Sequence, residues 1–398
     1  MFSSLLDYTP PVGMRHGFKS IFNALNSCRR GEEKEINVGL FNGQETIAFE
    51  SGKAALLAAL RAMALIQGER VNVIVPAYTC FSVAAVVERA GLRIVLCDVL
   101  PETLDFDYEM LSTLIDEETL CVIPTHLFGK SADVQYAKKM ADSQGAFVIE
   151  DSAQTLPDID GQRSDADVVI YSFGRGKPFS AGGGGLLASY REDIIESIGE
   201  LIELHVDNAF STQVSAALKI YINDLLISPY IYGLPASLPF LKIGKTIYPD
   251  NVEVEGMVNL KKMLINNMMC KYPSLSEGRR VKAQYYHQGL KLSGISEKIV
   301  HVGQGHYRPI RYPFYSQINI SNFSDKTISK AAKLGVVKMY PCGLHRLKRI
   351  QPFWSNKEME FPGADWIAGH LLSLPVHPLV TKQHQTKVIK FIESCITE

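Results

Sequence analysis

The stretch that decides the fold is VNVIVPAYTCFSVAAVVERAGLRIVLCDV, residues 71–99. It joins two short runs rich in β-branched residues, 71–75 and 92–99, through a segment long enough for about two or three helical turns. The alternation continues, with further apolar runs at 119–124, 146–150, 167–173 and 184–189 and helical stretches between most of them. Continuous apolar strands separated by helices are typical of a mostly parallel sheet covered on both faces. We therefore predict an α/β fold.

The sequence on either side of this region suggests how the chain is divided. KAALLAALRAMALI, residues 53–66, carries only Lys53 and Arg61 as polar residues, which predicts a buried helix. After about residue 250 the pattern changes to helices at 257–269 and 276–292, strands at 306–315 and 335–340, and a last helix at 381–395. We predict an N-terminal arm at 1–40, a large α/β domain at 41–250 and a smaller C-terminal α+β domain at 251–398.

Charge and cysteine content exclude several classes of protein. The 398 residues include 41 Lys and Arg against 42 Asp and Glu, a net charge of −1, which argues against nucleic-acid binding by bulk charge. The N-terminus lacks the basic start and apolar core of a secretory signal. The 7 cysteines are odd in number, include no CxxC pair and show no zinc-ligand spacing, so we expect reduced thiols, a cytoplasmic location and no metal.

Residues 220–244, IYINDLLISPYIYGLPASLPFLKIG, are strongly apolar. Asn223, Asp224 and three prolines interrupt them, which excludes one regular membrane-spanning helix. We favour buried or interface structure over an interfacial membrane anchor, and we expect no membrane association.

Polar and aromatic side chains follow four of the apolar runs. In a doubly wound sheet the ligand lies at the carboxyl ends of the strands, so we expect these side chains at one edge. They are Tyr78 and Phe81 after 71–75, His126 after 119–124, Asp151 and Gln154 after 146–150, and Ser172 and Lys177 after 167–173.

Two glycine-containing segments could surround an anionic ligand. Ser51-Gly52-Lys53 begins the predicted buried helix, where free amides and the helix dipole favour an anion. Gly182 to Gly185 allow close approach of the backbone, or form only a flexible turn. Neither Lys53 nor Lys177 lies in a GxxxxGK[ST] motif, and no GxGxxG follows a strand, which argues against a nucleotide phosphotransferase.

Pyridoxal phosphate (PLP) fits these residues better. It needs a lysine for its Schiff base, a carboxylate against the pyridinium nitrogen, an anion site for the phosphate and a flat group on the ring. Lys177, Asp151, the Ser51–Lys53 turn with Ser172, and Phe81 or Tyr78 could supply them.

The sequence resembles the DegT/DnrJ/StrS-type PLP-dependent aminotransferases of fold type I. The matching blocks are FESGKAALLAAL (49–60), VIVPAYTCFSVAAVVERAGLRIVLCDV (73–99), VIPTHLFGKSADV (122–134), VIEDSAQTL (148–156) and YSFGRGKPFSAGGGGLL (171–187), with a weaker match in LPVHPLV (374–380). Single blocks are weak signals, but together, in order over about 49–189, they are highly specific.

The resemblance implies a role for each matched residue. It implies that Lys177 forms the internal aldimine, that Asp151 keeps the ring nitrogen protonated, and that Gln154 lies beside the ring hydroxyl. It also implies a phosphate cradle made by Ser172 and the amides of Gly52, Lys53 and Ala54. Without the family blocks, a surface lysine and a helix-capping aspartate would be the more ordinary interpretations of Lys177 and Asp151.

Three features depart from the family pattern. Lys53 stands where members often carry threonine, although the backbone role is kept. Cys80 stands where many have a ring-stacking aromatic, so Phe81 or Tyr78 would replace it. After residue 200 we find no GYNYR-like segment of the kind whose asparagine reaches the neighbouring subunit's cofactor.

We predict an aminotransferase that moves an amino group, with glutamate as the expected donor, to a keto-sugar or related ketone. His126, Arg308 and Arg311 are candidate substrate contacts, with a core histidine and a solvated strand face as the alternatives. A PLP-dependent sugar dehydratase is the close alternative, although the resemblance implies histidine in place of Lys177 in that branch. A PLP-binding regulator without activity is a third hypothesis. We expect at least a homodimer.

Overall fold

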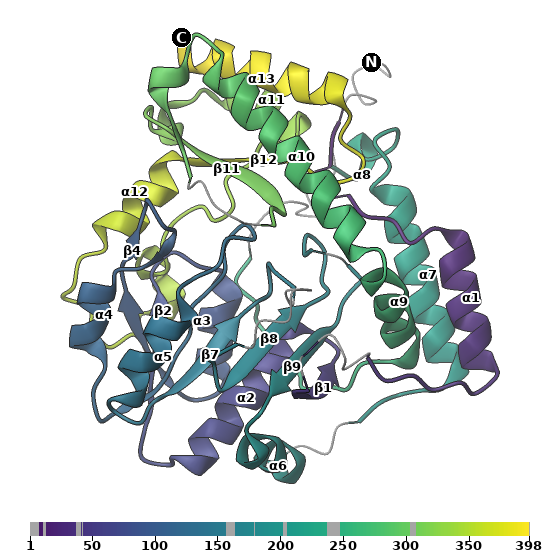
Figure 1. Ribbon diagram of the computed structural model, residues 1–398, viewed down its shortest axis with the longest axis vertical. Coiled ribbons are helices and arrows are strands. Elements are labelled where there is room, and N and C mark those ends of the chain that lie inside the picture. Colours follow the sequence, from purple (N-terminus) through teal and green to yellow (C-terminus); the bar gives the residue numbers. More distant parts are fainter. Residues whose placement is uncertain are drawn as a thin grey trace.

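The computed structural model describes residues 8–10, 13–36, 41, 43–156, 164–178, 180–201, 205–236, 247–302 and 308–397. Its largest layer is a sheet built from β1 (Glu45–Phe49), β2 (Asn72–Pro76), β3 (Arg93–Cys97), β6 (Thr119–Val122), β7 (Phe147–Asp151), β8 (Val168–Ser172) and β9 (Gly185–Ser189). The strand order is β1-β9-β8-β7-β6-β2-β3 (Figure 1). β9 pairs antiparallel with β1 and β8, and the other pairs are parallel. The prediction of a mostly parallel sheet is confirmed.

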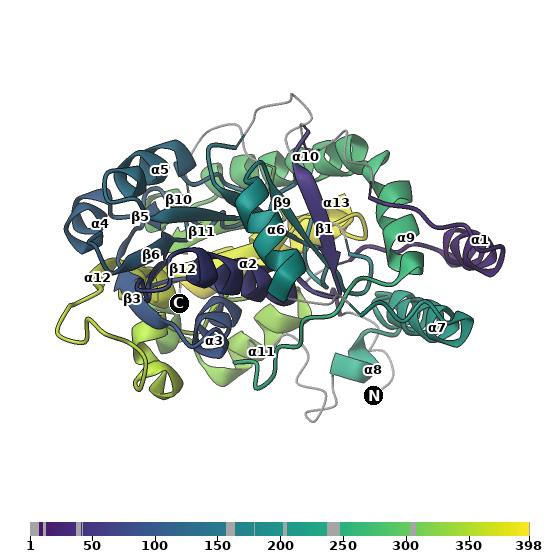
Figure 2. The ribbon, with the colours of Figure 1, turned by 90° about the horizontal axis from the view of Figure 1, so that it is seen from below.

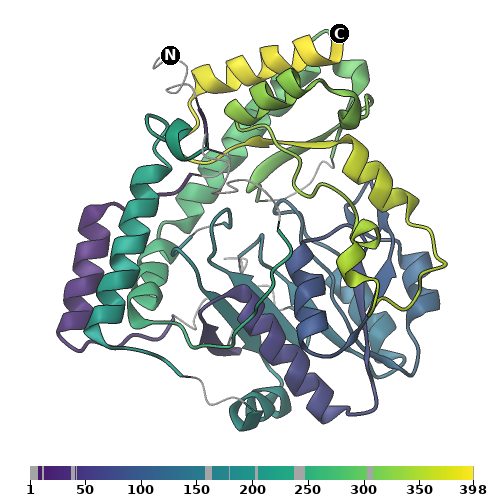
Figure 3. The same cartoon turned by 180° about the vertical axis from the view of Figure 1, so that it is seen from behind.

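Helices cover both faces of this sheet because its strands are apolar on both sides. In β2, Val73 and Val75 belong to the core under α2 (Gly52–Ile66) and α3 (Phe81–Arg89), whereas Ile74 points to α4 (Tyr108–Leu114) and α5 (Val134–Asp142). α6 (Glu192–Leu201) packs on α2. Figure 3 shows α2 and α3 in front of the sheet, and Figure 1 shows α4 and α5 on the opposite face. The small hairpin β4 (Val99–Leu100) and β5 (Asp105–Phe106) follows β3.

Three helices form a separate group beyond β1. They are α1 (Phe18–Arg29), α7 (Phe210–Leu226) and α9 (Asn259–Met269), and Ile21, Ala217 and Leu260 lie in their shared core. Figure 2 shows α1 and α7 side by side at this end of the molecule. The short helix α8 (Gly233–Ala236) follows α7.

A second, antiparallel sheet is formed by β10 (Ile299–His301), β11 (Arg311–Ser316) and β12 (Leu371–Pro375). It lies with α10 (Tyr272–Lys291), α11 (Asp325–Lys333), α12 (Pro362–His370) and α13 (Lys382–Thr397), above the large sheet in Figure 1. Short 3-10 turns lie at Ser296–Lys298, Ile320–Asn322, Leu344–Arg346 and Lys348–Ile350. The smaller α+β part is confirmed, while the boundaries at 40 and 250 stay predictions.

The strand predicted at 335–340 is wrong. Its only ladder contact in the described chain is a single bridge, in which Val337 and Ser373 exchange backbone hydrogen bonds of 3.2 and 3.0 Å. After that bridge the backbone turns away from β12, and Tyr340 enters the core of the large sheet instead. The apolar run therefore serves a crossing segment, which has the same composition as a buried strand.

The loop after β6 joins the two sheets. The Arg308 amide donates to the Gly129 carbonyl at 3.1 Å, and the Ile310 amide donates to the Phe128 carbonyl at 3.2 Å. Gly129 has φ +87°, and a side chain there would overlap the Arg308 backbone. Only glycine satisfies both demands, so this position fixes how closely the loop approaches β11.

The described residues contain neither a membrane-spanning helix nor a disulfide bond. No helix among them combines the length and the apolar character that crossing a membrane requires. The seven cysteines are all free thiols.

Candidate active site

Four adjacent strands bring the predicted residues to one edge of the large sheet. β8, β7, β6 and β2 are neighbours, and they are parallel to one another. Their carboxyl ends therefore coincide, and Ser172, Asp151, His126 and Tyr78 stand at or just beyond these ends. In Figure 1 this edge faces the smaller sheet. The strand-end argument from the sequence is confirmed for the arrangement of these four positions.

Asp151 is the last residue of β7 and is 8% exposed. Its Oδ1 accepts a hydrogen bond from the Ala153 amide at 3.0 Å. Burial raises the pKa of the Asp151 carboxyl, while the positive charge of Lys177 opposes that rise. The two residues lie near enough for this electrostatic contact, although they come from different strand ends. The Asp151 carboxylate and the Lys177 amine thus lie close to each other at this edge of the sheet.

Lys177 lies on the turn that follows β8 and is half-buried. Its amide donates to the Gly174 carbonyl at 3.3 Å, which closes the turn. The next carbonyl, that of Pro178, accepts a hydrogen bond from Nη2 of Arg279, a buried residue of α10. Burial lowers the pKa of Arg279, and no carboxylate among the described residues pairs with it. Arg279 therefore fixes the turn that carries Lys177 through the hydrogen bond to Pro178.

The start of α2 brings hydrogen-bond donors together, at the place where the sequence predicts an anion pocket. Ser51 caps the helix, with Oγ accepting from the Ala54 amide at 3.1 Å. The amides of Gly52 and Lys53 lie in the first turn of this helix, where N–H groups have no acceptor within the helix. Ser172 stands over them, because a Cβ on Gly52 would lie 3.2 Å from Ser172 Oγ. Two amides and one hydroxyl thus face the same space, and the Ala54 amide, which we expected to join them, is already occupied.

Close backbone packing explains the glycines around this pocket. A side chain at Gly185, the first residue of β9, would overlap the backbone of Ser51 and Gly52. Gly183 and Gly184 have φ values of +150° and +118°. The glycine run therefore lets β9 approach the helix start.

Gln154 links the site to a residue that the sequence analysis did not select. Its Oε1 accepts from the Phe128 amide at 2.9 Å, which fixes the amide group so that Nε2 donates to the Tyr340 hydroxyl at 3.1 Å. Tyr340 is buried, and its pKa is raised by burial and by the neighbouring Cys80 and Asp151. Because the phenol oxygen accepts from Gln154, its own proton is available to a further acceptor. No local motif marks Tyr340, which lies far from Asp151 in the sequence.

The candidate stacking residues lie close to Tyr340. Tyr78 is fully buried, with its ring centre 5.4 Å from that of Tyr340 in an edge-to-face arrangement, and the ring centre of buried Phe81 lies 6.4 Å from that of Tyr340. Cys80, between them, is the half-exposed position. Stacking by Phe81 stays a prediction, and Tyr340 joins it as an aromatic side chain of the site.

Two of the three candidate substrate contacts use their polar atoms within the protein. His126 Nδ1 accepts from the Ala132 amide at 2.9 Å, so Nε2 carries the ring proton and donates to Glu150 at 2.9 Å. Arg311 is buried, and it donates to Ser373 Oγ and to the carbonyls of Ser373 and Gly335. His126 thus has the surroundings of a core histidine, and Arg311 is not on a solvated strand face.

Arg308 is placed differently. It is half-buried beside the loop after β6, and its guanidinium lies 5.9 Å from the centre of the Tyr272 ring at the start of α10. This position lies next to the carbonyl of Gly129, at the junction of the two sheets. Arg308 also forms a side-chain hydrogen bond with Tyr272, and a substrate contact by Arg308 stays a prediction.

Glu150 supports the position of Asp151 from the buried side. It accepts hydrogen bonds from His126, Ser152 and Ser164. Burial alone raises the pKa of Glu150, but His126 and the two hydroxyls outweigh it and lower that pKa to about 2. The carboxylate next to Asp151 in the chain is therefore a structural anion with its own partners.

Comparison with known proteins gives one family. The model of the DegT/DnrJ/EryC1/StrS aminotransferase family matches residues 34–223 and 256–393. The match continues past residue 200 through most of α7 and resumes at 256, where it includes the weaker block at 374–380. The segment that the match omits, 224–255, contains most of the apolar stretch singled out in the sequence.

Similar proteins are found among curated sequences and solved structures. The chain is 25% identical over 359 residues to the "Pleiotropic regulatory protein" of Geobacillus stearothermophilus, covering 86% of this chain and 82% of that protein. It is 26% identical over 374 residues to the UDP-N-acetyl-3-dehydro-alpha-D-glucosamine 3-aminotransferase of Acidithiobacillus ferrooxidans, covering 92% and 88%. The fold matches that of NtdA from Bacillus subtilis, solved with the cofactor PMP, with TM-score 0.71, 18% identity, and 96% and 82% of the chains covered.

Proposed function

Since this chain belongs to the DegT/DnrJ/EryC1/StrS aminotransferase family, we propose that it transfers an amino group from glutamate to the keto group of a sugar. The observation that carries this proposal is the meeting of Lys177 with Asp151 beside the anion pocket at the start of α2. An amine, a buried carboxylate and a phosphate-sized set of donors are the parts that PLP-dependent amino transfer requires.

The residues present fit PLP. The first-turn amides of Gly52 and Lys53 and the Ser172 hydroxyl suit its phosphate, and a side chain on Gly52 would fill the space between them. Burial opposes the ionisation of Asp151, and a protonated ring nitrogen would give the ionised carboxylate a partner. When bound, PLP withdraws electrons from the substrate carbon that carries nitrogen.

The side chains of this chain would then handle protons and orientation. The Lys177 amine, on the half-buried turn after β8, would take the proton from the substrate carbon that bears nitrogen and hold it for the return step. Asp151 would hold a proton at the ring nitrogen. Gln154 and Tyr340 would orient the ring through its polar substituent. Arg308 would bind an anionic group of the substrate.

The sugar in this proposal is supported by relatives. The Acidithiobacillus protein is named as an aminotransferase of a UDP-linked keto-sugar, and this chain covers 88% of it. The test is to load the purified enzyme with PLP and add glutamate. We expect the visible band of the bound cofactor to bleach as 2-oxoglutarate forms, and a nucleotide-linked keto-sugar to restore it while ¹⁵N from labelled glutamate enters the sugar. Bound PLP with a band that no amino acid alters would contradict the proposal.

A regulator without catalytic activity is the second candidate, because one relative is named a pleiotropic regulatory protein. The same titration separates the two functions. A regulator would bind PLP and amino acids without releasing a keto acid.

Arg279 gives a prediction about how Lys177 is positioned. Replacing Arg279 with methionine keeps the length of the side chain but removes the bond to the Pro178 carbonyl. Since small displacements of a reacting group are costly, we expect kcat to fall by roughly tenfold to a hundredfold with a smaller change in KM. Arg280→Met is the matched control, because Arg280 is exposed and pairs only with Glu277 in the described chain. Equal losses in the two variants would refute the positioning role.

We also propose that the chain forms a homodimer through α7. Phe210, Val214, Leu218, Ile222 and Leu225 recur every three or four residues on one side of that helix and are 39–56% exposed. Phe18 of α1 extends this surface through its ring contact with Tyr221. A continuous apolar stripe of this kind on a soluble enzyme is typical of a subunit contact.

The dimer proposal is tested by placing a charge in the stripe. Leu218→Glu is expected to weaken association about 30-fold or more, because burying the carboxylate would be costly. Leu292→Glu is the control, since Leu292 is 88% exposed and lies beyond α10. Size-exclusion chromatography with light scattering should show a dimer for wild type and the control. A dimer that tolerates the charge at 218 would place the interface elsewhere.

A further inference from the structure

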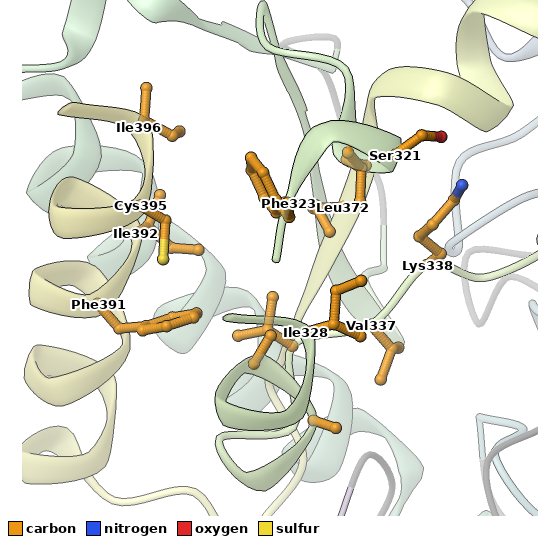
Figure 4. Close-up of a pocket in the computed structure, with 14 residues that line it drawn as sticks. Ser321, Phe323, Ile328, Val337, Lys338, Leu372, Phe391, Ile392, Cys395 and Ile396 are labelled. Carbon is orange, nitrogen blue, oxygen red and sulfur yellow. The ribbon is translucent and has the colours of Figure 1, made fainter. Parts of the chain in front are cut away.

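The smaller sheet carries a cavity that the proposed reaction does not use. It has a volume of about 320 Å³ and lies between α11, α13 and β12, with the residues of its walls drawn in Figure 4. Phe391, Ile392 and Ile396 of α13 form one wall, and Leu372 of β12 forms another. The space is in the range that small-molecule sites occupy, and its lining is almost entirely apolar.

α11 forms an exposed wall of this cavity. The helix is amphipathic, and it presents Ile328, Ala331 and Ala332 to the cavity. None of its residues is buried, and Ile328 is 47% exposed. Amphipathic helices of globular proteins bury their apolar face against a core. The opposing residues of α13 are buried, with Phe391 5% and Ile392 2% exposed, so α11 is the wall of the cavity that stays open to solvent.

The charged groups at the cavity are basic. Lys338 lines it on the side away from α13, as Figure 4 shows, and Lys330 of α11 places Nζ 5.3 Å from the centre of the Phe391 ring. Lys338 is half-buried, and within the described chain no carboxylate pairs with it. None of the lining residues is acidic. An occupant with an apolar body and one anionic end would satisfy both the walls and the lysine.

We propose that this cavity binds a free medium-chain fatty acid, with its alkyl chain between α11 and α13 and its carboxylate on Lys338. The proposal does not depend on the reaction of the active site. The cavity wall is nonetheless connected to the active site. Its residues 336–338 lead directly to Tyr340, which accepts a hydrogen bond from Gln154. A ligand here would therefore press on a segment that ends in the active site.

The test is calorimetric titration of the PLP-loaded enzyme with decanoate. We expect one site per chain, with octanoate binding about tenfold more weakly because it buries two fewer methylene groups. Lys338→Met should weaken decanoate about tenfold by removing the cation. Ile328→Trp should abolish binding by filling the cavity, and it should fold because α11 contributes no buried residue. Lys326→Met, on the exposed part of α11, should bind like wild type.

Three results would overturn the proposal. One is no heat from the wild-type enzyme. The second is equal affinity in the wild type and both cavity variants, since binding would then be elsewhere. The third is a change of oligomeric state in Ile328→Asp, which would show that a second copy of the chain covers this face.

Discussion

Lys177→Ala is expected to lower turnover by about a thousandfold while the protein still folds and still binds PLP non-covalently. In the proposed mechanism the Lys177 amine carries the proton between two carbons, and removing a positioned acid–base group costs about 10²–10⁴ in rate. The proposed phosphate site at Gly52, Lys53 and Ser172 does not involve the Lys177 side chain, so cofactor affinity should fall much less than turnover.

Three measurements check this prediction. The visible absorption band that borohydride fixes in the wild type should be absent from the variant. Added primary amines should restore part of the activity, increasingly with their basicity, because they replace the missing proton carrier. Arg175→Ala, an exposed position on the same turn, controls for damage to the turn itself. A variant that keeps a tenth of the wild-type rate would show that another group carries the proton.

The part of the site that could be predicted from the sequence lies at the strand ends. Asp151 and Ser172 each close an apolar run, and the carboxyl ends of parallel strands meet whatever the rest of the chain does. The buried helix after Ser51 was equally predictable, since nine of its residues are indeed buried. These features depend on local sequence pattern, so they can be predicted from a single sequence.

The part that could not be predicted depends on contacts between distant segments. Tyr340 meets Gln154 across 186 residues, and Arg279 meets Pro178 across 101. Neither has a local signal: Tyr340 ends an apolar run that looks like a strand, and Arg279 is one of two adjacent arginines in a helix. Only the path of the backbone decides that Arg279 is buried and Arg280 exposed. The same limit applies to His126, whose two ring partners became visible only with the fold.

One internal segment, 224–255, lies outside the family match, and it begins within the last turn of α7. Tyr230 and Leu234, in its described part, are exposed. Both residues follow the apolar stripe of α7 in the chain, so the proposed dimer contact can extend into this segment.

Asp151→Asn is expected to have opposite effects on activity and on stability. Asparagine keeps the acceptor for the Ala153 amide but cannot hold a proton at the ring nitrogen, so turnover should fall roughly a hundredfold or more. In the cofactor-free protein, burial raises the pKa of Asp151 above its unfolded value. Its favourable contribution to folding is therefore present below the unfolded pKa and is lost as pH rises through the folded pKa. At neutral pH the buried, ionised carboxylate lowers the free energy of unfolding, and replacing it with asparagine removes this loss.

The cofactor-free variant should consequently melt about 2 °C above the cofactor-free wild type near neutral pH, and this difference should shrink as the pH is lowered and Asp151 becomes protonated. PLP should reverse the order, because the charged ring gives the wild-type carboxylate its partner and leaves asparagine with none. Thermal melts with and without PLP at several pH values separate the two contributions. A cofactor-free variant less stable than the wild type at neutral pH would contradict this prediction. It would mean that the attraction between Asp151 and Lys177 outweighs the cost of burying the carboxylate, so that Asp151 stabilises the folded protein.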